Sequence, residues 1–121
     1  MQKRRFVVTG GNGFVGQFLI KKLSSLYPDS EIHNIDIHHP IGLGLSNVSN
    51  HIIDLTNQQS LKSFKFSAND TVYHLAAYIF TDQVPSKAKS EGWFVSLNVY
   101  GTQNLLAVME ENGVKNIAFI S

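Results

Sequence analysis

The sequence predicts an α/β fold in which a parallel sheet of about five strands is covered by helices on both faces. Three observations lead to this prediction. Short β-branched runs alternate with stretches of helical periodicity, the connections between them are short, and a cluster of glycines stands where the first strand would pass into the first helix. The chain contains no internal repeat, low-complexity tract or linker, so we expect one domain over residues 1–121.

The first half of the chain predicts two strands, a helix and a loop. Residues 5–9 form a β-branched and aromatic run, and residues 31–36 predict a second strand. Between them, residues 14–26 have helical periodicity and should end before Pro28, which disfavours helical geometry in the preceding residue. Residues 38–50, rich in Pro, Gly, Ser and Asn, predict a loop. The expected buried stripe of the helix consists of Phe14, Val15, Phe18, Leu19, Leu23 and Leu26.

The second half predicts three further strands and two helices. Residues 51–54 predict a short strand, and Thr56 is placed to cap a helix that runs to about Phe64. Residues 70–76 form an apolar run typical of a buried parallel strand. A long helix is expected over residues 91–112, with Gly113 as its stop signal. Residues 116–121 predict the last strand.

The composition excludes several classes of protein. Ten Lys and Arg against nine Asp and Glu leave a formal charge of +1, which argues against general binding to nucleic acid or to acidic membranes. The absence of cysteine excludes disulfides, thiolate metal sites and cysteine nucleophiles. Five scattered histidines lack the spacing of zinc ligands, so we predict no metal site. No apolar run approaches the roughly 20 residues of a membrane span, and we expect a cytoplasmic protein.

The strongest chemical signal is the glycine cluster at residues 9–16, between the first strand and the first helix. Glycines there permit a tight turn, the approach of a phosphate to the backbone, and close packing of helix on strand. Two dinucleotide spacings fit, GxGxxG from Gly11 and TGxxGxxG from Thr9, and a tight turn without ligand is the alternative. A mononucleotide P-loop is excluded, because Gln17 and Phe18 occupy the positions of its Lys and Ser or Thr.

Asp36 indicates which dinucleotide this turn would bind. It ends the second strand 20 positions after Gly16, where an acidic residue would accept hydrogen bonds from the adenosine ribose. Its carboxylate would repel a 2′-phosphate, and its neighbours Ile37, His38 and His39 include no Arg or Lys. The sequence therefore favours NAD over NADP, with the alternative that Asp36 merely begins a loop.

Four stretches resemble the extended branch of the short-chain dehydrogenase/reductase superfamily, which contains nucleotide-sugar epimerases, dehydratases and 3β-hydroxysteroid-type dehydrogenases. These stretches are TGGNGFVG at 9–16, the Asp-Leu pair of IIDLT at 52–56, YHLAA at 73–77 and NVYGTQNLL at 98–106. The resemblance implies a Rossmann-type doubly wound sheet, NAD as cofactor, and a parent reaction that transfers hydride between a substrate and nicotinamide.

The resemblance also implies a set of cofactor-binding residues. The turn around the pyrophosphate would comprise Gly10, Gly11, Asn12, Gly13, Phe14, Val15 and Gly16. Asp36 and Ile37 would lie at the ribose, and Asp54 and Leu55 beside the adenine. Leu75, Ala76, Ala77, Asn98 and Ser121 would lie toward the nicotinamide. Asp54 could instead only start a helix, and Ala76 and Ala77 could be ordinary core residues.

The catalytic pattern of this superfamily is missing, since none of the four tyrosines is followed by Lys at the fourth position. We therefore assign no catalytic residue. We expect the sheet to be truncated after its fifth strand and the chain to be inactive alone. The sequence assigns no substrate. The alternative is a natural, non-catalytic nucleotide-binding or interaction module. An uncovered last strand predicts a homodimer through that edge of the sheet.

Overall fold

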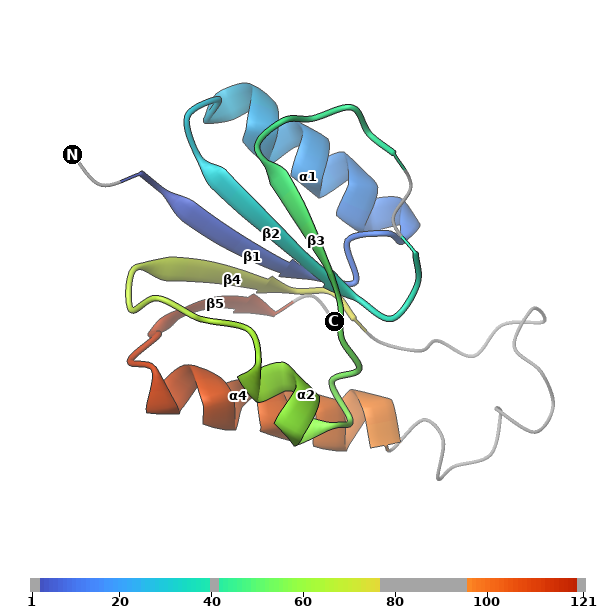
Figure 1. Ribbon diagram of the computed structural model, residues 1–121, viewed down its shortest axis with the longest axis vertical. Coiled ribbons are helices and arrows are strands. Elements are labelled where there is room, and N and C mark those ends of the chain that lie inside the picture. Colours follow the sequence, from blue (N-terminus) through green and yellow to red (C-terminus); the bar gives the residue numbers. More distant parts are fainter. Residues whose placement is uncertain (1–2, 40–41, 77–95, 120–121) are drawn as a thin grey trace, which may run out of the picture.

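Five parallel strands form one sheet in the order β3-β2-β1-β4-β5 in the computed structural model, which describes residues 3–39, 42–76 and 96–119 (Figure 1). The strands are β1 (Arg5–Thr9), β2 (Glu31–Asp36), β3 (Val48–Ile52), β4 (Asp70–His74) and β5 (Asn116–Phe119). Strand β1 lies between β2 and β4, so the chain turns back across the sheet between β3 and β4. This order confirms the predicted Rossmann-type α/β fold, and such a reversal opens a crevice at the carboxyl ends of the strands.

Helices cover both faces of the sheet. Helix α1 (Phe14–Leu26) lies on one face, and α2 (Gln58–Lys62) and α4 (Thr102–Glu111) lie on the other (Figure 1). A π-helical segment, η1 (Ser96–Gly101), leads directly into α4. The described residues include no helix long and apolar enough to cross a membrane.

Alternate residues of the strands supply two hydrophobic clusters, one on each face. The cluster under α2 and α4 includes Val7, Ile35, Val72, Leu105 and Val108. The cluster under α1 consists of Phe6, Val8, Ile20, Leu23 and Ile32. Strand β1 contributes to both, because successive side chains of a strand point to opposite faces.

Helix α1 has the predicted bounds, and of its predicted stripe Leu23 is buried and Leu19 partly buried, but the other four residues are exposed, namely Phe14, Val15, Phe18 and Leu26. Gly16, Ile20 and Leu23 are buried, whereas Phe14 and Phe18 are 80% and 62% exposed. Gly16 sets this rotation, because a Cβ at this position would lie 2.6 Å from the Gly11 Cα. The helix therefore turns its glycine toward the sheet, and residues four and seven positions later follow on the same face.

Several predicted boundaries also need correction. Strand β3 begins at Val48, inside the predicted loop, because residues 48–52 pair in register with β2. Asn57 caps α2 in place of Thr56, since its side chain accepts a hydrogen bond from the Ser60 N–H, and α2 ends at Lys62, before the predicted end. Strand β4 ends at His74, and the described part of the predicted long helix begins as a π-helical segment. Residues 91–95 and 120–121 lie outside the described residues.

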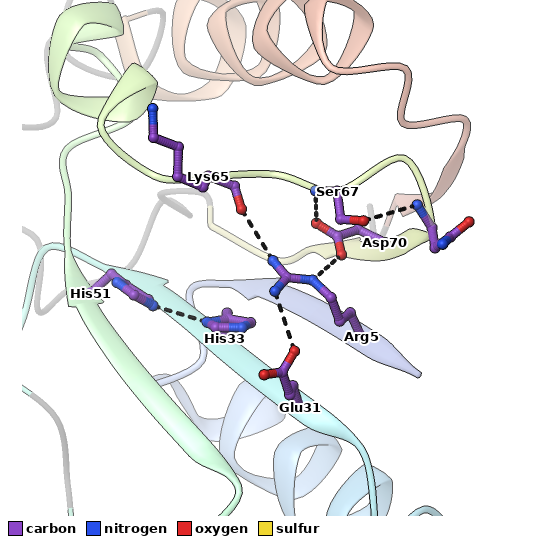
Figure 2. A network of polar contacts seen from close by, with 8 residues as sticks. Arg5, Glu31, His33, His51, Lys65, Ser67 and Asp70 are labelled. Carbon is purple, nitrogen blue, oxygen red and sulfur yellow. Dashed lines mark hydrogen bonds and ion pairs between the residues drawn. The ribbon is translucent and has the colours of Figure 1, made fainter. Parts of the chain in front are cut away.

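An arginine joins three strands at the end of the sheet where the strands begin, which we call the amino edge (Figure 2). Arg5 donates from Nε to Asp70 Oδ1 at 2.6 Å, from Nη1 to Glu31 Oε2 at 3.2 Å and from Nη2 to the Lys65 carbonyl at 3.1 Å. Asp70 is fully buried and also accepts from the Ser67 N–H at 2.8 Å. Desolvation lowers the Arg5 pKa, but the hydrogen bond and charge of Asp70 outweigh it and raise that pKa above its ordinary value.

Two histidines lie near this arginine on adjacent strands (Figure 2). His33 Nδ1 and His51 Nε2 are 3.0 Å apart and share one hydrogen bond. Both rings pack against Phe64 in T-shaped geometry, with ring centroids 5.3 and 4.9 Å from that of Phe64. Burial, followed by the positive charge of Arg5, lowers the pKa of both histidines. Within the described ranges, no group of three or more His, Asp or Glu is placed to hold a metal ion.

Candidate functional site

The glycine turn connects β1 to α1 at the end of the sheet where the strands finish, which we call the carboxyl edge. Gly10 has a φ of +74°, which is strained for any residue with a side chain, and its N–H donates to the Ile35 carbonyl at 2.8 Å. A Cβ at Gly10 would lie 2.8 Å from the Ala76 backbone nitrogen. The turn is therefore pressed against the segment that follows β4.

The other glycines of the turn differ in what they allow. A Cβ at Gly11 would overlap the Asn34 side-chain amide, and one at Gly16 would overlap the Gly10 carbonyl oxygen. Gly13 is exposed, and its Cβ would meet only the Gly10 oxygen, at 3.4 Å, which is an ordinary contact. The fold thus requires glycine at positions 11 and 16 but leaves open space beside Gly13.

Helix α1 begins beside this open space. Gly13 is its N-cap residue and provides no side-chain hydrogen bond to the first turn. The first-turn amides of a helix have no intrahelical partner and carry a partial positive charge. This end of α1 is consequently suited to an anionic group. Phe14 and Val15, which the resemblance assigned to the same turn, are 80% and 57% exposed.

Asp36 lies against the turn, as its predicted role requires. The Asn12 N–H donates to Asp36 Oδ2 and the His38 N–H donates to Asp36 Oδ1, each at 3.0 Å. Asp36 is 9% exposed. A carboxylate offers about four lone-pair positions, so Asp36 retains the capacity to accept further hydrogen bonds. Ile37, the next residue, is 40% exposed.

The sequence analysis missed Asn34, a buried polar residue of β2 in contact with the turn. Its Oδ1 accepts from the Gly11 N–H at 2.9 Å, and its Nδ2 donates to Asn12 Oδ1 at 2.8 Å. A cavity of about 310 Å³ lies between α1, β2, β3 and the segment from Gly42 to Ser46, with Asn34 on its wall. No distinct signal in the sequence marks this residue, because its strand also contains the polar residues Glu31, His33 and Asp36.

Asp54 and Leu55, expected at an adenine ring, follow β3. Asp54 is exposed, and its Oδ1 accepts from the N–H and the hydroxyl of Thr56, at 2.9 and 2.7 Å. Leu55 is 2% exposed and packs in the cluster under α2 and α4, while its carbonyl accepts from Asn104 Nδ2 at 2.8 Å. The Asp54 carboxylate therefore stabilises the turn before α2, whereas the N-cap residue of that helix is Asn57.

A chain of hydroxyl and imidazole contacts holds the segment after β4. The Thr9 Oγ1 accepts from the N–H groups of Leu75 and Ala76, each at 3.1 Å, and lies 2.6 Å from His74 Nδ1. With two donors already at this oxygen, the Thr9 hydroxyl donates its proton to Nδ1, so His74 is the Nε2–H tautomer.

The same chain continues from His74 to the helix on the other side of β4. His74 Nε2 lies 2.8 Å from the Thr102 Oγ1, which in turn donates to the Asn98 carbonyl at 3.0 Å. Burial lowers the His74 pKa, in keeping with a neutral ring. The structure thus connects Leu75, Ala76 and Asn98, whereas Ala77 and Ser121 lie outside the described residues.

Comparisons with known proteins place this arrangement among related sequences. The sequence profile of the 3-beta hydroxysteroid dehydrogenase/isomerase family matches residues 7–121. The chain is 36% identical over 115 residues to N-acetyl-alpha-D-glucosaminyl-diphospho-ditrans,octacis-undecaprenol 4-epimerase of Escherichia coli O157:H7, covering 95% of this chain and 31% of the relative.

Solved structures show the same architecture. Uronate dehydrogenase from Agrobacterium tumefaciens superposes with a TM-score of 0.79 at 21% identity, covering 100% of this chain and 41% of that one. A short-chain dehydrogenase/reductase superfamily protein from the same organism, solved with bound NAD, has a TM-score of 0.75 at 24% identity, with 96% and 32% covered. The chain thus spans about a third of the length of the curated relatives it matches, at 31% and 32% for two of them.

Proposed function

Since the chain belongs to the 3-beta hydroxysteroid dehydrogenase/isomerase family, we propose that it binds NAD at the glycine turn between β1 and α1. The predicted resemblance to the extended short-chain dehydrogenases is confirmed by this family match. NAD is bound in the solved structure of one superfamily protein with the same fold, which supports the choice of cofactor.

The observation that carries this proposal is the space beside Gly13. The fold itself requires glycine at positions 10, 11 and 16, but a side chain at Gly13 would meet no more than an ordinary contact. A glycine there is explained if a ligand approaches the backbone, and the uncapped start of α1 favours an anion. A pyrophosphate fits both features.

The preference for NAD over NADP would come from Asp36. Its carboxylate lies beside the turn at the end of β2, where it can accept hydrogen bonds from ribose hydroxyls and repel a 2′-phosphate. We expect the substitution Asp36→Ala to weaken NAD binding by about tenfold, the effect of one lost charge-assisted hydrogen bond. The same substitution should reduce the preference for NAD over NADP. Competition titrations with both dinucleotides measure this ratio, and an unchanged NAD affinity would refute the ribose assignment.

The remaining contacts belong to the same proposal. Asp54 and Leu55 would lie toward the adenine, and Leu75, Ala76, Ala77, Asn98 and Ser121 toward the nicotinamide. The buried side chain of Leu55 limits its contribution to its backbone and to the shape of the site. Asp54 would have to accept from the adenine while it also accepts from Thr56.

Nicotinamide, when bound, supplies a carbon that accepts or donates hydride. The residues of this chain would bind and orient the dinucleotide, and Thr9 and His74 would hold the segment after β4 against the turn. The sequence contains no Tyr followed by Lys at the fourth position, so we propose that these 121 residues alone do not catalyse the reaction.

We also propose that the chain forms a homodimer in the cytoplasm through the edge of β5. Among the described strands β5 pairs only with β4, and its Ile117 and Phe119 are 37% and 58% exposed. An open, apolar edge strand favours pairing with a second copy. Light scattering should detect a dimer that Ile117→Lys disrupts, and a monomer at high concentration would refute this arrangement.

Isothermal calorimetry of the 121-residue chain tests the central proposal. NAD, ADP-ribose and AMP should bind with Kd values in the range of about 0.1 to 1 mM, with ADP-ribose nearly as strong as NAD, because most of the proposed contacts would be made to the adenosine and pyrophosphate. GTP is the control, since the turn lacks the Lys of a mononucleotide site. If none of the three adenosine ligands produces a heat of binding at millimolar concentration, the proposal is overturned.

A further inference from the structure

A buried asparagine, Asn34, joins the glycine turn to two other segments of the chain. It is 2% exposed in the middle of β2, where an amide is unfavourable unless its polar atoms are paired. Its Oδ1 accepts from the Gly11 N–H at 2.9 Å. Its Nδ2 donates to the Oδ1 of Asn12 at 2.8 Å and to the Oδ1 of Asn50 at 3.1 Å. Both amide hydrogens are therefore in use.

Backbone groups at the two ends fix the direction of this hydrogen-bond chain. The Gly11 N–H can only donate, so the Asn34 oxygen faces it. The carbonyls of His38 and His39 can only accept, and the Asn12 Nδ2 donates to them at 3.0 and 3.2 Å. The Asn12 oxygen is thus left to accept from Asn34. We call Asn50, Asn34 and Asn12 the asparagine relay.

We infer that Asn34 is a positioning residue for the adenosine diphosphate half of the dinucleotide, an inference that rests on the proposed function. The Asp36 carboxylate accepts from the backbone N–H groups of Asn12 and His38. The relay holds both of these neighbours, one through its side chain and the other through its carbonyl. The distance between the ribose-binding carboxylate and the phosphate-binding turn is therefore set by Asn34.

The contact with Gly11 explains why this positioning needs an amide of this size. A Cβ at position 11 would overlap the Asn34 side chain, so the turn is closed directly onto the strand. Replacement by leucine would leave the Gly11 N–H and the Asn12 oxygen without partners. The substitution Asn34→Asp keeps the acceptor for Gly11 but turns a second oxygen toward the oxygens of Asn12 and Asn50. Protonation of that carboxyl at low pH restores one donor.

The test is the affinity of the whole chain for ADP-ribose, measured by calorimetry in three variants. Asn34→Leu and Asn34→Asp should each weaken binding at pH 7.5 by roughly tenfold or more, the effect of one lost buried hydrogen bond. The matched control is Asn47→Ala, since Asn47 also bridges α1 and the chain before β2 through two side-chain bonds, but at the amino edge. This control should bind within about twofold of wild type.

Two further readouts separate positioning from a loss of stability. The affinity of Asn34→Asp for ADP-ribose should rise toward that of wild type as the pH falls from 8 to 5.5. Burial of the new carboxyl and the facing oxygens of Asn12 and Asn50 favour its protonated form. Amide hydrogen exchange without ligand should accelerate at Gly11 in Asn34→Leu and stay unchanged in Asn47→Ala.

Each result of these measurements decides between the claims. If wild type binds ADP-ribose and both Asn34 variants bind it with the same affinity, the inference is overturned and the proposed function stands. Equal losses in the Asn34 variants and in Asn47→Ala also overturn it, because the loss would then follow stability. Absence of wild-type binding refutes the proposed function, and this inference with it.

Discussion

Polar side chains join neighbouring strands at both the amino edge and the carboxyl edge of the sheet, but they do so with different chemistry. At the amino edge, Arg5 joins β1 to β2 and β4 through charged partners, and the buried Asp70 is fully engaged (Figure 2). At the carboxyl edge, neutral asparagines join β1, β2 and β3, and open space lies beside Gly13 at the uncapped start of α1.

This difference separates a structural network from the proposed binding site. The donors of the Arg5 guanidinium are directed at acceptors of the chain itself, so the network fixes the register of the strands. At the carboxyl edge the turn contacts β2 through Asn34 and Asp36, and the first turn of α1 has no side-chain cap. Stability should therefore respond to changes at the amino edge, and ligand affinity to changes at the carboxyl edge.

The largest effect is expected from breaking the buried ion pair at the amino edge. Asp70→Ala should lower the free energy of unfolding by about 3 kcal/mol, because it leaves Arg5 and the Ser67 N–H without their buried acceptor. Urea denaturation measures the loss. The control is Lys62→Ala, which breaks the exposed pair with Glu111 at 3.9 Å and should change stability by less than about 0.5 kcal/mol. Equal midpoints for both variants would contradict the structural role of the network.

A large effect on binding with a small effect on folding is expected at Gly13. Gly13→Val should weaken ADP-ribose binding by about a hundredfold, or about 2.7 kcal/mol, because the side chain would fill the approach to the backbone. The chain should remain folded, since the new Cβ would meet only an ordinary contact. Gly16→Val is the matched control at the same turn and should unfold the chain, because position 16 is packed against Gly10 and Gly11. Full ligand affinity in Gly13→Val would place the ligand elsewhere.

The smallest effect is a pH dependence of stability from the histidine pair on β2 and β3. The pKa values of His33 and His51 are lowered in the folded chain, so near their ordinary value of 6.5 the unfolded chain takes up protons that the folded chain does not. The free energy of unfolding should fall as the pH drops below about 7. His51→Gln should reduce this slope. Denaturation midpoints between pH 8 and 5.5 decide the question, and a rise in stability on acidification would contradict the assignment.

Local signals in the sequence were sufficient for most of the fold. The glycine turn, the strand at residues 5–9 and the bounds of the helix at residues 14–26 were predicted from composition and periodicity and are confirmed. The position of Asp36 beside the turn also follows from its spacing. Its role toward the ribose stays a prediction.

The failures have a common physical cause in long-range packing. The buried face of α1 is set by the contact of Gly16 with the turn, which outweighs the periodicity of Phe14 and Phe18. The predicted strand at residues 51–54 begins earlier, at Val48, because residues 48–52 pair with β2, and the polar residues Ser49 and Asn50 give no strand signal of their own. Asn34 was missed because its role depends on partners 16 to 23 positions away.

The most direct test of the account is a titration of the 15N-labelled chain with ADP-ribose, followed by amide chemical shifts. The proposed site predicts perturbations concentrated at residues 10–16 and at Asp36 to His39, with none at Arg5, Ser67 or Asp70 at the opposite edge. Shifts confined to the amino edge, or no shifts at millimolar ligand, would contradict the claim that the carboxyl edge is the dinucleotide site.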